Sequence, residues 1–470
     1  MSDPLWTSGQ ALAATGGMLI GDTGWTCSGI SIDTRTLEKG DLFVALKDVR
    51  DGHDFAAMAM EKGAAACLVS RGDLGLEPAL QVPDVLDALR ALGTASRDRC
   101  DAIRVAVTGS VGKTSVKEAL AAVFRAAGPA HWSVKSYNNH WGVPLTLARM
   151  PRSTERAVFE MGMNHAGEIR DLSSLVRPHV ALITRIAPAH LEHLGTMEAI
   201  ADAKSEIFEG LENDGVAIYP ADDDHAERLA RHAKRSCAAF MLDFGRSKDA
   251  AIRIEDFETG LTGSTGLVNV LGIRTRFHIR ASGDHWAWNV AAIFAAAAAS
   301  GLDAHAVADA LASVDAEAGR GRALEITLPG GGSFTLLDDA YNANPVSMAA
   351  AISALGAAQP AGQGRRIAVL GDMFELGPDE ARLHADLAEP LDAAAVDAVF
   401  ACGERMHHLH DALPSNRRAG YARDAGEALE MIISAVRPGD VVLLKGSNAS
   451  GLHRIAARLA DGSAFGLTEA

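Results

Sequence analysis

The sequence predicts an α/β fold in three domains, and two observations support this prediction. Apolar strands alternate with helical stretches in the central part of the 470-residue chain, where strands are expected at residues 105–107, 157–159, 180–183 and 216–219. Such alternation is typical of a mainly parallel sheet with helices on both faces. The same pattern begins again near residue 319, after a run rich in glycine and arginine, which indicates a further domain.

We expect domains at residues 1–100, 101–318 and 319–470, each long enough to bury a core of its own. The third is expected to be a smaller, Rossmann-like unit. Outside the central sheet, strands are expected at residues 40–46, 65–69, 252–279 (several short ones), 334–337, 367–370, 398–402 and 441–444, and helices at 55–62, 83–97 and from 285 onward.

The strand at residues 105–107 runs into a glycine loop that ends in Gly-Lys-Thr. Its two glycines are separated by two residues, whereas the common phosphate-binding loop has four between them. The backbone N–H groups of such a loop and the following helix N-terminus stabilise a phosphate chain. Lys113 would reach the β- and γ-phosphates, and Thr114 would offer its hydroxyl to Mg²⁺. The residues expected to bind ATP here are Gly109, Ser110, Val111, Gly112, Lys113, Thr114 and Ser115.

Composition and charge exclude several classes of protein. The formal net charge of −16 argues against a nucleic-acid-binding protein, because no basic stripe offsets it. The five cysteines are scattered without a C-x-x-C pair, which indicates a reduced protein without structural zinc or disulfides. The most apolar helix candidate, residues 286–300, is shorter than the ~20 residues of a membrane span. No signal peptide is recognised, so we expect a cytoplasmic protein.

Three residues that follow the central strands are candidates for the chemistry. Glu160 comes directly after the strand at residues 157–159, so its carboxylate is expected beside the phosphate loop as an oxygen ligand for Mg²⁺. The alternative is a strand-end glutamate in solvent. His190 follows the strand at residues 180–183, and Lys204 lies on the next helix. By themselves these two are interpreted as a structural histidine and a surface lysine.

Together these features resemble the Mur ligases, the ATP-dependent amide-forming enzymes of peptidoglycan precursor synthesis. Further matching motifs lie at residues 137–144, 160–168, 188–192, 338–345 and 370–377. The last two are similar to the branch that adds D-alanyl-D-alanine to UDP-N-acetylmuramoyl-tripeptide. The resemblance implies these two substrates as partners and ATP with two Mg²⁺ ions as cofactors, and we expect a monomer.

The resemblance also implies a metal and catalytic site. Thr114 and Glu160 would hold one Mg²⁺ ion, and His190 would help to hold a second. Lys204 would be converted by CO₂ to a carbamate, which turns a cation into an anionic oxygen ligand. Lys113, His190 and Lys204 are therefore the expected catalytic residues.

Other residues are expected to contact nucleotide or substrate through the same resemblance. Asn289 would lie near the adenine, and Arg322 and Asp339 would reach the ATP phosphates and ribose. The amino-terminal domain is similar to the family's uridine-nucleotide domain. The residues expected to bind UDP or the rest of the substrate are Ser31, Thr34, Arg35, Asn138, Asn139, Tyr341 and Asn344. As isolated residues, the first three would be assigned to turns or to the surface.

The implied reaction activates a carboxylate. The terminal carboxylate of the tripeptide would attack the γ-phosphate of ATP, and the amine of D-alanyl-D-alanine would then displace phosphate from the acyl phosphate. Lys113 and the two metal ions would stabilise the charge on the phosphoryl oxygens, while domain closure would exclude water. No residue identifies itself as the base for the incoming ammonium, although Glu192 and His193 are weak candidates.

Three alternatives stay open. One is another Mur-type or folylpolyglutamate synthetase-like ligase, and the latter generally lacks a separate amino-terminal domain. The others are a binding protein without turnover and a small-molecule kinase. Two positions depart from the family pattern: Arg185 stands where asparagine is frequent, and residues 445–451 keep only their Lys-Gly-Ser start. The third residue of the peptide, diaminopimelate or lysine, is not indicated.

Overall fold

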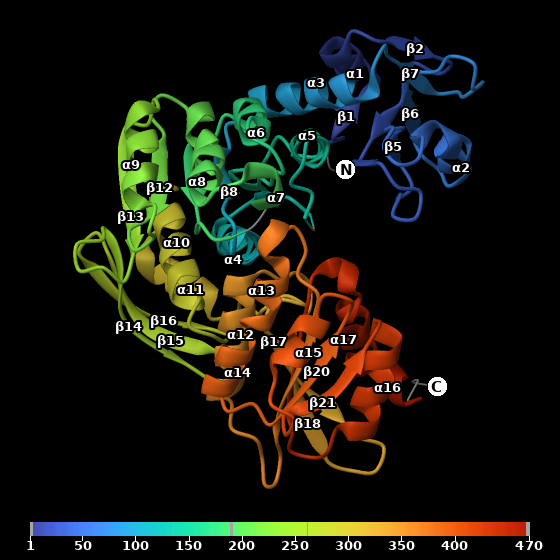
Figure 1. Ribbon diagram of the computed structural model, residues 1–470. Coiled ribbons are helices and arrows are strands. Elements are labelled where there is room, and N and C mark those ends of the chain that lie inside the picture. The colour runs from blue at the N-terminus through green and yellow to red at the C-terminus, as the bar shows by residue number, and fades with distance from the viewer. Residues whose placement is uncertain (1–2, 135, 189–190, 261, 467–470) are drawn as a thin grey trace.

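The computed structural model describes residues 3–134, 136–188, 191–260 and 262–466, which form three α/β domains in chain order (Figure 1). The amino-terminal domain and the central domain meet along helix α3, while the carboxy-terminal domain lies against the other side of the central domain. Each domain is built around its own sheet. The predicted α/β fold is therefore confirmed.

The amino-terminal domain has a five-stranded sheet in the order β2-β7-β6-β5-β4, in which only β2 is antiparallel to its neighbour. A short antiparallel pair, β1 with β3, lies beside it. The elements are β1 (Trp6–Thr7), α1 (Ser8–Thr15), β2 (Met18–Ile20), β3 (Thr26–Cys27), β4 (Gly29–Ser31), β5 (Asp41–Val44), η1 (Gly52–Phe55), α2 (Ala56–Glu61), β6 (Ala66–Val69), β7 (Ala79–Gln81) and α3 (Val85–Asp98).

Helix α3 joins the first two domains through a shared core. The side chain of Asp84 caps its N-terminus by accepting from Asp87 N. Leu89 and Leu92 of α3 belong to the same buried cluster as Leu145 and Ala148 of α5 (Gly142–Ala148). Trp6 Nε1 also donates to the carbonyl of Ala148 at 2.9 Å. The amino-terminal domain is thus packed firmly on the central one.

The central sheet has nine strands in the order β16-β15-β14-β13-β12-β11-β8-β10-β9. The strands from β9 to β14 are parallel to their neighbours, and β14, β15 and β16 form an antiparallel end. The strands are β8 (Ile103–Thr108), β9 (Ala130–Trp132), β10 (Arg156–Glu160), β11 (Val180–Ile183), β12 (Val216–Pro220), β13 (Phe240–Gly245), β14 (Ile252–Thr259), β15 (Ser264–Val270) and β16 (Ile273–Ile279).

Helices cover both faces of the central sheet, as the alternating pattern predicts. One buried cluster packs α4, α10 and α11 on one face, and a second packs α5, α6, α8 and α9 on the other. The remaining helices of this domain are α4 (Lys113–Ala127), α6 (Glu168–Val176), α7 (Leu191–Leu194), α8 (Met197–Ser205), η2 (Glu206–Gly210), α9 (Ala226–Arg235), α10 (Trp286–Ala299) and α11 (Ala304–Leu311). The alanine-rich α10 is buried on nearly all sides. In the described residues, no helix combines the length and apolarity needed to cross a membrane.

The carboxy-terminal domain has a six-stranded sheet in the order β17-β18-β22-β19-β20-β21, with only β17 antiparallel. Helices again pack on both faces. The elements are β17 (Arg322–Thr327), β18 (Ser333–Asp339), α12 (Pro345–Ala357), β19 (Arg366–Gly371), η3 (Gly377–Asp379), α13 (Glu380–Ala385), α14 (Ala388–Ala393), β20 (Ala398–Cys402), α15 (His407–Ala412), β21 (Arg418–Ala422), α16 (Ala425–Ala435), β22 (Val441–Lys445), η4 (Asn448–Ser450), α17 (Leu452–Ala460) and η5 (Ser463–Phe465).

Most strands that were not predicted are short or lie at sheet edges; β13 is an exception, because it has six residues and lies between β12 and β14. Strands β1 to β4 have two or three residues each, and β17 and β21 carry polar or small residues at the two edges of the third sheet. Such segments lack the apolar run that identifies a buried strand. The three sheets fall within the three expected ranges, whereas the boundaries near residues 100 and 318 stay predictions.

Candidate nucleotide site and second cavity

The glycine loop lies between the end of β8 and the start of α4, and it is tightly enclosed. Gly112 is the N-cap of α4 with φ +84°, a backbone region that favours glycine. A Cβ atom at Gly112 would lie 2.5 Å from Asn289 Oδ1, and one at Gly109 would lie 2.0 Å from Thr184 Oγ1. Only glycine fits both positions, so the loop backbone approaches β11 and α10 closely.

Lys113 is the first residue of α4, and its ammonium is held against the loop. Its Nζ donates to the carbonyl of Gly109 at 2.6 Å. Burial lowers the pKa of Lys113, the Glu160 carboxylate opposes that change, and the charge of Arg320 adds to it. A buried cation with one carbonyl partner is well placed to accept an anionic ligand instead.

Glu160 ends β10, the strand next to β8, and its side chain is 1 % exposed. Asn138 Nδ2 donates to Glu160 Oε1 at 2.8 Å. Oε2 has no hydrogen-bond partner within the described part of the chain. Leaving a buried carboxylate oxygen unpaired is unfavourable, so this atom is a candidate cation ligand.

Lys204 is buried near the end of α8 and is 1 % exposed. Its interpretation as a surface lysine is therefore wrong. Burial, followed by the positive charge of Lys113, lowers the pKa of Lys204 well below its usual value. This change favours the neutral amine, which is the nucleophilic form of a lysine side chain.

A cavity of about 260 Å³ lies where the glycine loop meets the carboxy-terminal domain. One direct contact joins the two walls, since Ser136 Oγ and Tyr341 Oη are 2.8 Å apart. Within the carboxy-terminal wall, the Arg320 guanidinium lies over the Tyr341 ring at 4.4 Å. The lining from the central domain is Ser110, Val111, Gly112, Lys113, Thr114, Ser115, Ser136, Asn138, Glu160, Thr184, Arg185, His285, Trp288 and Asn289. From the linker and the carboxy-terminal domain come Gly319, Arg320, Asp339, Tyr341, Asn342, Asn344, Val346, Ser347, Ala350, Ala351 and Lys445.

Several buried polar atoms around this cavity lack partners. Ser110 Oγ, Asn289 Nδ2 and His285 Nδ1 have none among the described residues. Burial also lowers the pKa of His285, so its imidazole is neutral and can accept or donate a hydrogen bond. Buried polar groups in native proteins are normally paired. Unpaired hydrogen-bond donors and acceptors around one cavity fit a polar, phosphate-bearing ligand.

The structure places one arginine differently from expectation. Arg322 is exposed at the start of β17 and does not line the cavity, whereas Arg320, two residues earlier, does. The two lie in the same Gly-Arg-Gly-Arg run, and spacing alone does not distinguish them. Asp339 lines the cavity as expected and pairs with Lys445 Nζ at 2.8 Å. Lys445 was not predicted, although its position at the end of an apolar strand was a usable signal.

Four of the seven residues expected to bind substrate lie outside the amino-terminal domain, and they fall into two groups. Asn138, Tyr341 and Asn344 line the cavity beside the glycine loop. Asn139 does not; its Oδ1 accepts from Gly142 N at 2.9 Å at the start of α5. Asn344 also caps a helix, because its Oδ1 accepts from Ser347 N. Capping satisfies backbone groups at a helix start and is a structural role for both side chains.

The active-site loop after β11 is described only in part. His190 lies outside the described residues, as does the side chain of His193. Glu192, on the short helix α7, is exposed. Among the described residues, no group of three or more His, Cys, Asp or Glu side chains is arranged as a metal site. This pattern is compatible with Mg²⁺, which is commonly held by one or two protein oxygens together with phosphates and water.

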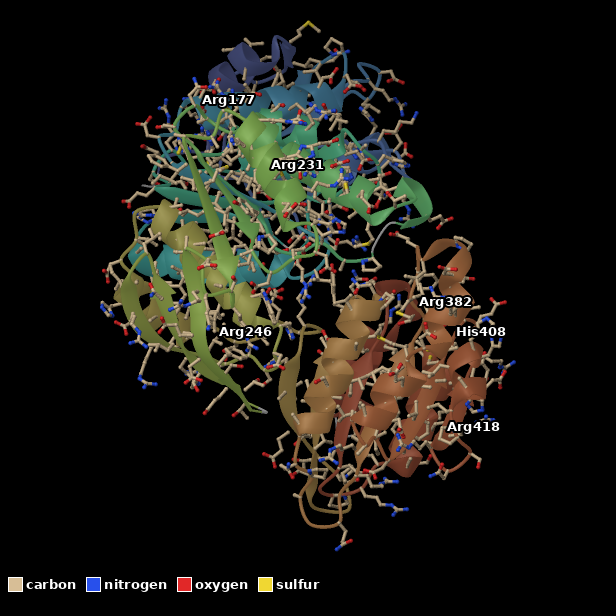
Figure 2. The ribbon with its side chains drawn as sticks, turned by 60° about the vertical axis from the view of Figure 1, so that its left-hand side comes forward. Arg177, Arg231, Arg246, Arg382, His408 and Arg418 are labelled. Carbon is tan, nitrogen blue, oxygen red and sulfur yellow. The ribbon has the colours of Figure 1, made fainter. Side chains whose placement is uncertain are left out.

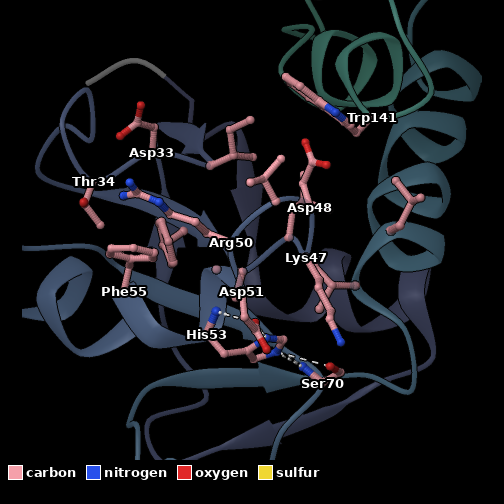
Figure 3. A pocket seen from close by; sticks show the side chains of 18 of the residues that line it. Asp33, Thr34, Lys47, Asp48, Arg50, Asp51, His53, Phe55, Ser70 and Trp141 are labelled. Carbon is pink, nitrogen blue, oxygen red and sulfur yellow. Dashed lines mark hydrogen bonds and ion pairs between the residues drawn. The ribbon is translucent and has the colours of Figure 1, made fainter.

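A second and larger cavity, about 1000 Å³, lies in the amino-terminal domain and is shown in Figure 3. Thr34 and Arg35 line it, and so do Lys47 and Arg50, which were not predicted. Arg50 extends into the cavity, and Trp141 of the central domain faces it from the opposite side (Figure 3). Ser31 does not line the cavity, since it is buried with its Oγ donating to Asp33 O at 3.0 Å.

The floor of this second cavity holds Asp51, His53 and Ser70 in a row (Figure 3). His53 Nδ1 lies 2.6 Å from Asp51 Oδ1, and this hydrogen bond lowers the pKa of the Asp51 carboxyl. His53 Nε2 accepts from the backbone N–H of Ser70 at 2.9 Å. That lone pair is therefore not free to take a proton from the Ser70 hydroxyl. The arrangement contains the residue types of a nucleophilic triad, but its hydrogen bonds have a structural role, because they connect the segments that form the cavity floor.

Comparisons with known proteins agree with this geometry. The family models "Mur ligase middle domain" and "Mur ligase, glutamate ligase domain" match residues 107–297 and 321–448. The UDP-N-acetylmuramoyl-tripeptide--D-alanyl-D-alanine ligase of Escherichia coli (strain K12) is 36% identical over 446 residues, which cover 93% of this chain and 94% of the relative.

Two solved structures are similar over nearly the full length. MurF from Acinetobacter baumannii has a TM-score of 0.84 at 29% identity, covering 98% of this chain and 99% of the other. MurF ligase from Thermotoga maritima in complex with ADP has a TM-score of 0.77 at 25% identity, covering 93% of this chain and 98% of the other.

Replacement of Gly112 tests the enclosed loop. We expect Gly112→Ala to weaken ATP binding by about tenfold or more, because the left-handed backbone would be strained and the new Cβ would collide with Asn289 Oδ1. Isothermal titration calorimetry measures the change. Gly9→Ala, at a position with no atom within 4 Å of the added Cβ, is the control. Equal affinity of the Gly112→Ala variant and the wild type would contradict the packing argument.

Proposed function

The chain belongs to the Mur ligase family, and on that basis we propose that it joins D-alanyl-D-alanine to UDP-N-acetylmuramoyl-tripeptide at the expense of ATP. The relatives that span most of the chain carry this activity in their names. The observation that carries the proposal is the single cavity lined by both the glycine loop and the carboxy-terminal domain. A ligase of this kind needs such a cavity, because one ATP-activated group must meet a second substrate.

ATP binds with its phosphates on the glycine loop. The backbone N–H groups at the start of α4 and the Lys113 ammonium bind the phosphate oxygens. Asn289, with its unpaired Nδ2, lies at the cavity wall where the nucleoside extends. Arg320 and Lys445 add positive charge from the side of the carboxy-terminal domain. We assign ATP contact to Arg320 in preference to Arg322, because only Arg320 reaches this cavity.

The residues present fit a magnesium ion. Glu160 Oε2 is buried and unpaired in the described structure, and the Thr114 hydroxyl lines the same cavity, so these two oxygens would hold Mg²⁺. By family resemblance, His190 and a carbamate on Lys204 would hold a second ion. When bound, the metal neutralises the developing charge on the phosphoryl group. The buried, neutral amine of Lys204 is the form that reacts with CO₂.

The ligation has two chemical steps. The terminal carboxylate of the tripeptide attacks the γ-phosphorus, the bond to ADP breaks, and an acyl phosphate forms. The neutral amine of D-alanyl-D-alanine then attacks the acyl carbon, and phosphate leaves with the bonding electron pair. Lys113 stabilises the phosphoryl oxygens during the first step. Contacts between the two domains, such as that of Ser136 with Tyr341, help to exclude water from the acyl phosphate.

The second cavity is the proposed site for the UDP part of the substrate. Arg50 and Lys47 line it, and neither pairs with a carboxylate in the described part of the chain. Guanidinium and ammonium groups are suited to a diphosphate. One short segment links the two cavities: Ser136 and Asn138 line the first, whereas Tyr137 and Trp141 line the second. The peptide of the substrate would follow this segment from UDP to the γ-phosphate.

The alternatives fit these features less well. A folylpolyglutamate synthetase-like ligase has no need of a large cavity in a separate amino-terminal domain. A kinase has no need of a buried lysine such as Lys204, whose pKa is lowered by burial and by the charge of Lys113. We propose that the protein acts as a monomer. The five cysteines are unpaired, as expected in the cytoplasm, where we place the reaction.

Turnover should depend on both proposed substrates. With ATP, Mg²⁺ and UDP-N-acetylmuramoyl-tripeptide, we expect phosphate release to rise only when D-alanyl-D-alanine is added, because the acyl phosphate is otherwise protected from water. A coupled phosphate assay, with the product identified by mass spectrometry, makes the measurement. Comparable turnover with a folate and glutamate would overturn the assignment.

Lys204 should be required for ligation. We expect Lys204→Ala to lower kcat by about a hundredfold or more, and a short carboxylic acid such as acetate to restore part of it by supplying the missing oxygen ligand. Lys234→Ala, which removes an exposed lysine from α9, is the matched control. Normal ligation by the Lys204→Ala variant would show that this amine has only a packing role.

Arg50 should recognise the diphosphate. We expect Arg50→Ala to weaken UDP binding by about tenfold, as the loss of one charge-assisted hydrogen bond predicts, while uridine binding changes little. Arg90→Ala, on α3 and outside the cavity, serves as the control. If the variant loses affinity equally for UDP and uridine, Arg50 does not contact the phosphates.

A further inference from the structure

Arg185 follows the end of β11, and its backbone is fixed to the glycine loop. The carbonyl of Arg185 accepts from Ser110 N at 2.7 Å. A Cβ atom on Gly109 would lie 3.1 Å from Arg185 N, so the two segments are in close contact. The next residue is held as well, because Ile186 N donates to Asp223 Oδ2 at 2.9 Å. The start of the Arg185 side chain is therefore set beside the first glycine of the loop.

The side chain of Arg185 lines the nucleotide cavity, and its guanidinium lies over the Trp288 ring, 5.3 Å from the centroid. In the described structure, no carboxylate forms an ion pair with it. A cation–π contact is weaker than a charge-assisted hydrogen bond, and the guanidinium fork matches phosphate geometry. The group is thus a half-buried cation that lacks an anionic partner in a cavity suited to phosphates.

Trp288 contacts a second guanidinium, which provides an internal comparison. Arg246 lies over the same ring at 5.1 Å, and Trp288 Nε1 donates to Asp222 Oδ2 at 3.3 Å. Arg246 is exposed on the central domain (Figure 2), and it does not line the nucleotide cavity. The two arginines therefore share an aromatic partner and differ in their access to the cavity.

We propose that Arg185 is a phosphate-binding residue, whose guanidinium rests on Trp288 and binds the β- or γ-phosphate of ATP. This inference rests on the proposed function in one respect, that ATP occupies the glycine loop. The backbone of Arg185 is held against the loop residues Gly109 and Ser110, which are expected to contact the phosphates, so its side chain begins beside them. Arg185 thus adds a further cation to Lys113, Arg320 and Lys445 in the same cavity.

The test compares nucleotides that differ only in phosphate number. For the full chain, the dissociation constants of AMP, ADP and ATP are measured by calorimetry for the wild type and for Arg185→Gln, Arg185→Lys and Arg246→Gln. We expect Arg185→Gln to raise the dissociation constant of ATP by at least about tenfold and that of AMP by less than about threefold. Arg185→Lys should recover part of the ATP affinity, and Arg246→Gln should leave all three constants unchanged.

A fluorescence measurement follows Trp288 directly. ATP should change the tryptophan emission of the wild type, and this change should be absent in Trp288→Phe and much reduced in Arg185→Gln. Equal loss of AMP and ATP affinity in Arg185→Gln, or no loss at all, would overturn the proposal. Failure of the proposed function is seen separately, as a wild type that binds ATP but does not ligate. UDP binding by each variant confirms that it is folded.

Discussion

The site depends on the balance of charge among Glu160, Lys113 and Lys204. Glu160 has one buried oxygen without a partner in the described structure, and its charge favours the protonated form of Lys113. Lys113 in turn disfavours the protonated form of Lys204, which is already buried. One carboxylate cannot neutralise two nearby ammonium groups, so the uncharged form of the fully buried Lys204 is favoured. A phosphate chain would compensate the positive charge of Lys113, and a divalent cation would compensate the negative charge of Glu160.

The backbone brings these charges together through one property of parallel sheets. Strands β8, β10 and β11 are neighbours, and their carboxyl ends meet at the same edge. This places three features side by side: the loop after β8, Glu160 at the end of β10, and Arg185 after β11. The hydrogen-bonded residues Thr108 and Thr184, for example, are 76 positions apart in the sequence. Close approach requires the two loop glycines, since a side chain at either would collide with Thr184 or Asn289.

The flanking domains complete this edge in different ways. The amino-terminal domain shares a buried core with α5, so its cavity has a stable position relative to the sheet. The carboxy-terminal domain closes the nucleotide cavity through a few polar contacts, including Tyr341 with Ser136. Polar contacts can be exchanged more readily than a shared apolar core. The proposed UDP site is therefore fixed to the central sheet more firmly than the carboxy-terminal wall of the nucleotide cavity is.

The sequence by itself determined the α/β fold, the main strands, the glycine loop and the family, because these depend on contiguous residues and on backbone periodicity. It also indicated Glu160, which directly follows an apolar strand, and, through the family resemblance, Asp339. Only the tertiary structure decided that Lys204 is buried, that Arg320 lines the nucleotide cavity in place of Arg322, and that Asn139 serves as a helix cap. It likewise decided that Arg50 faces the second cavity. The reason is physical: the burial and pairing of a long polar side chain depend on which distant elements surround it, and local sequence does not encode that environment.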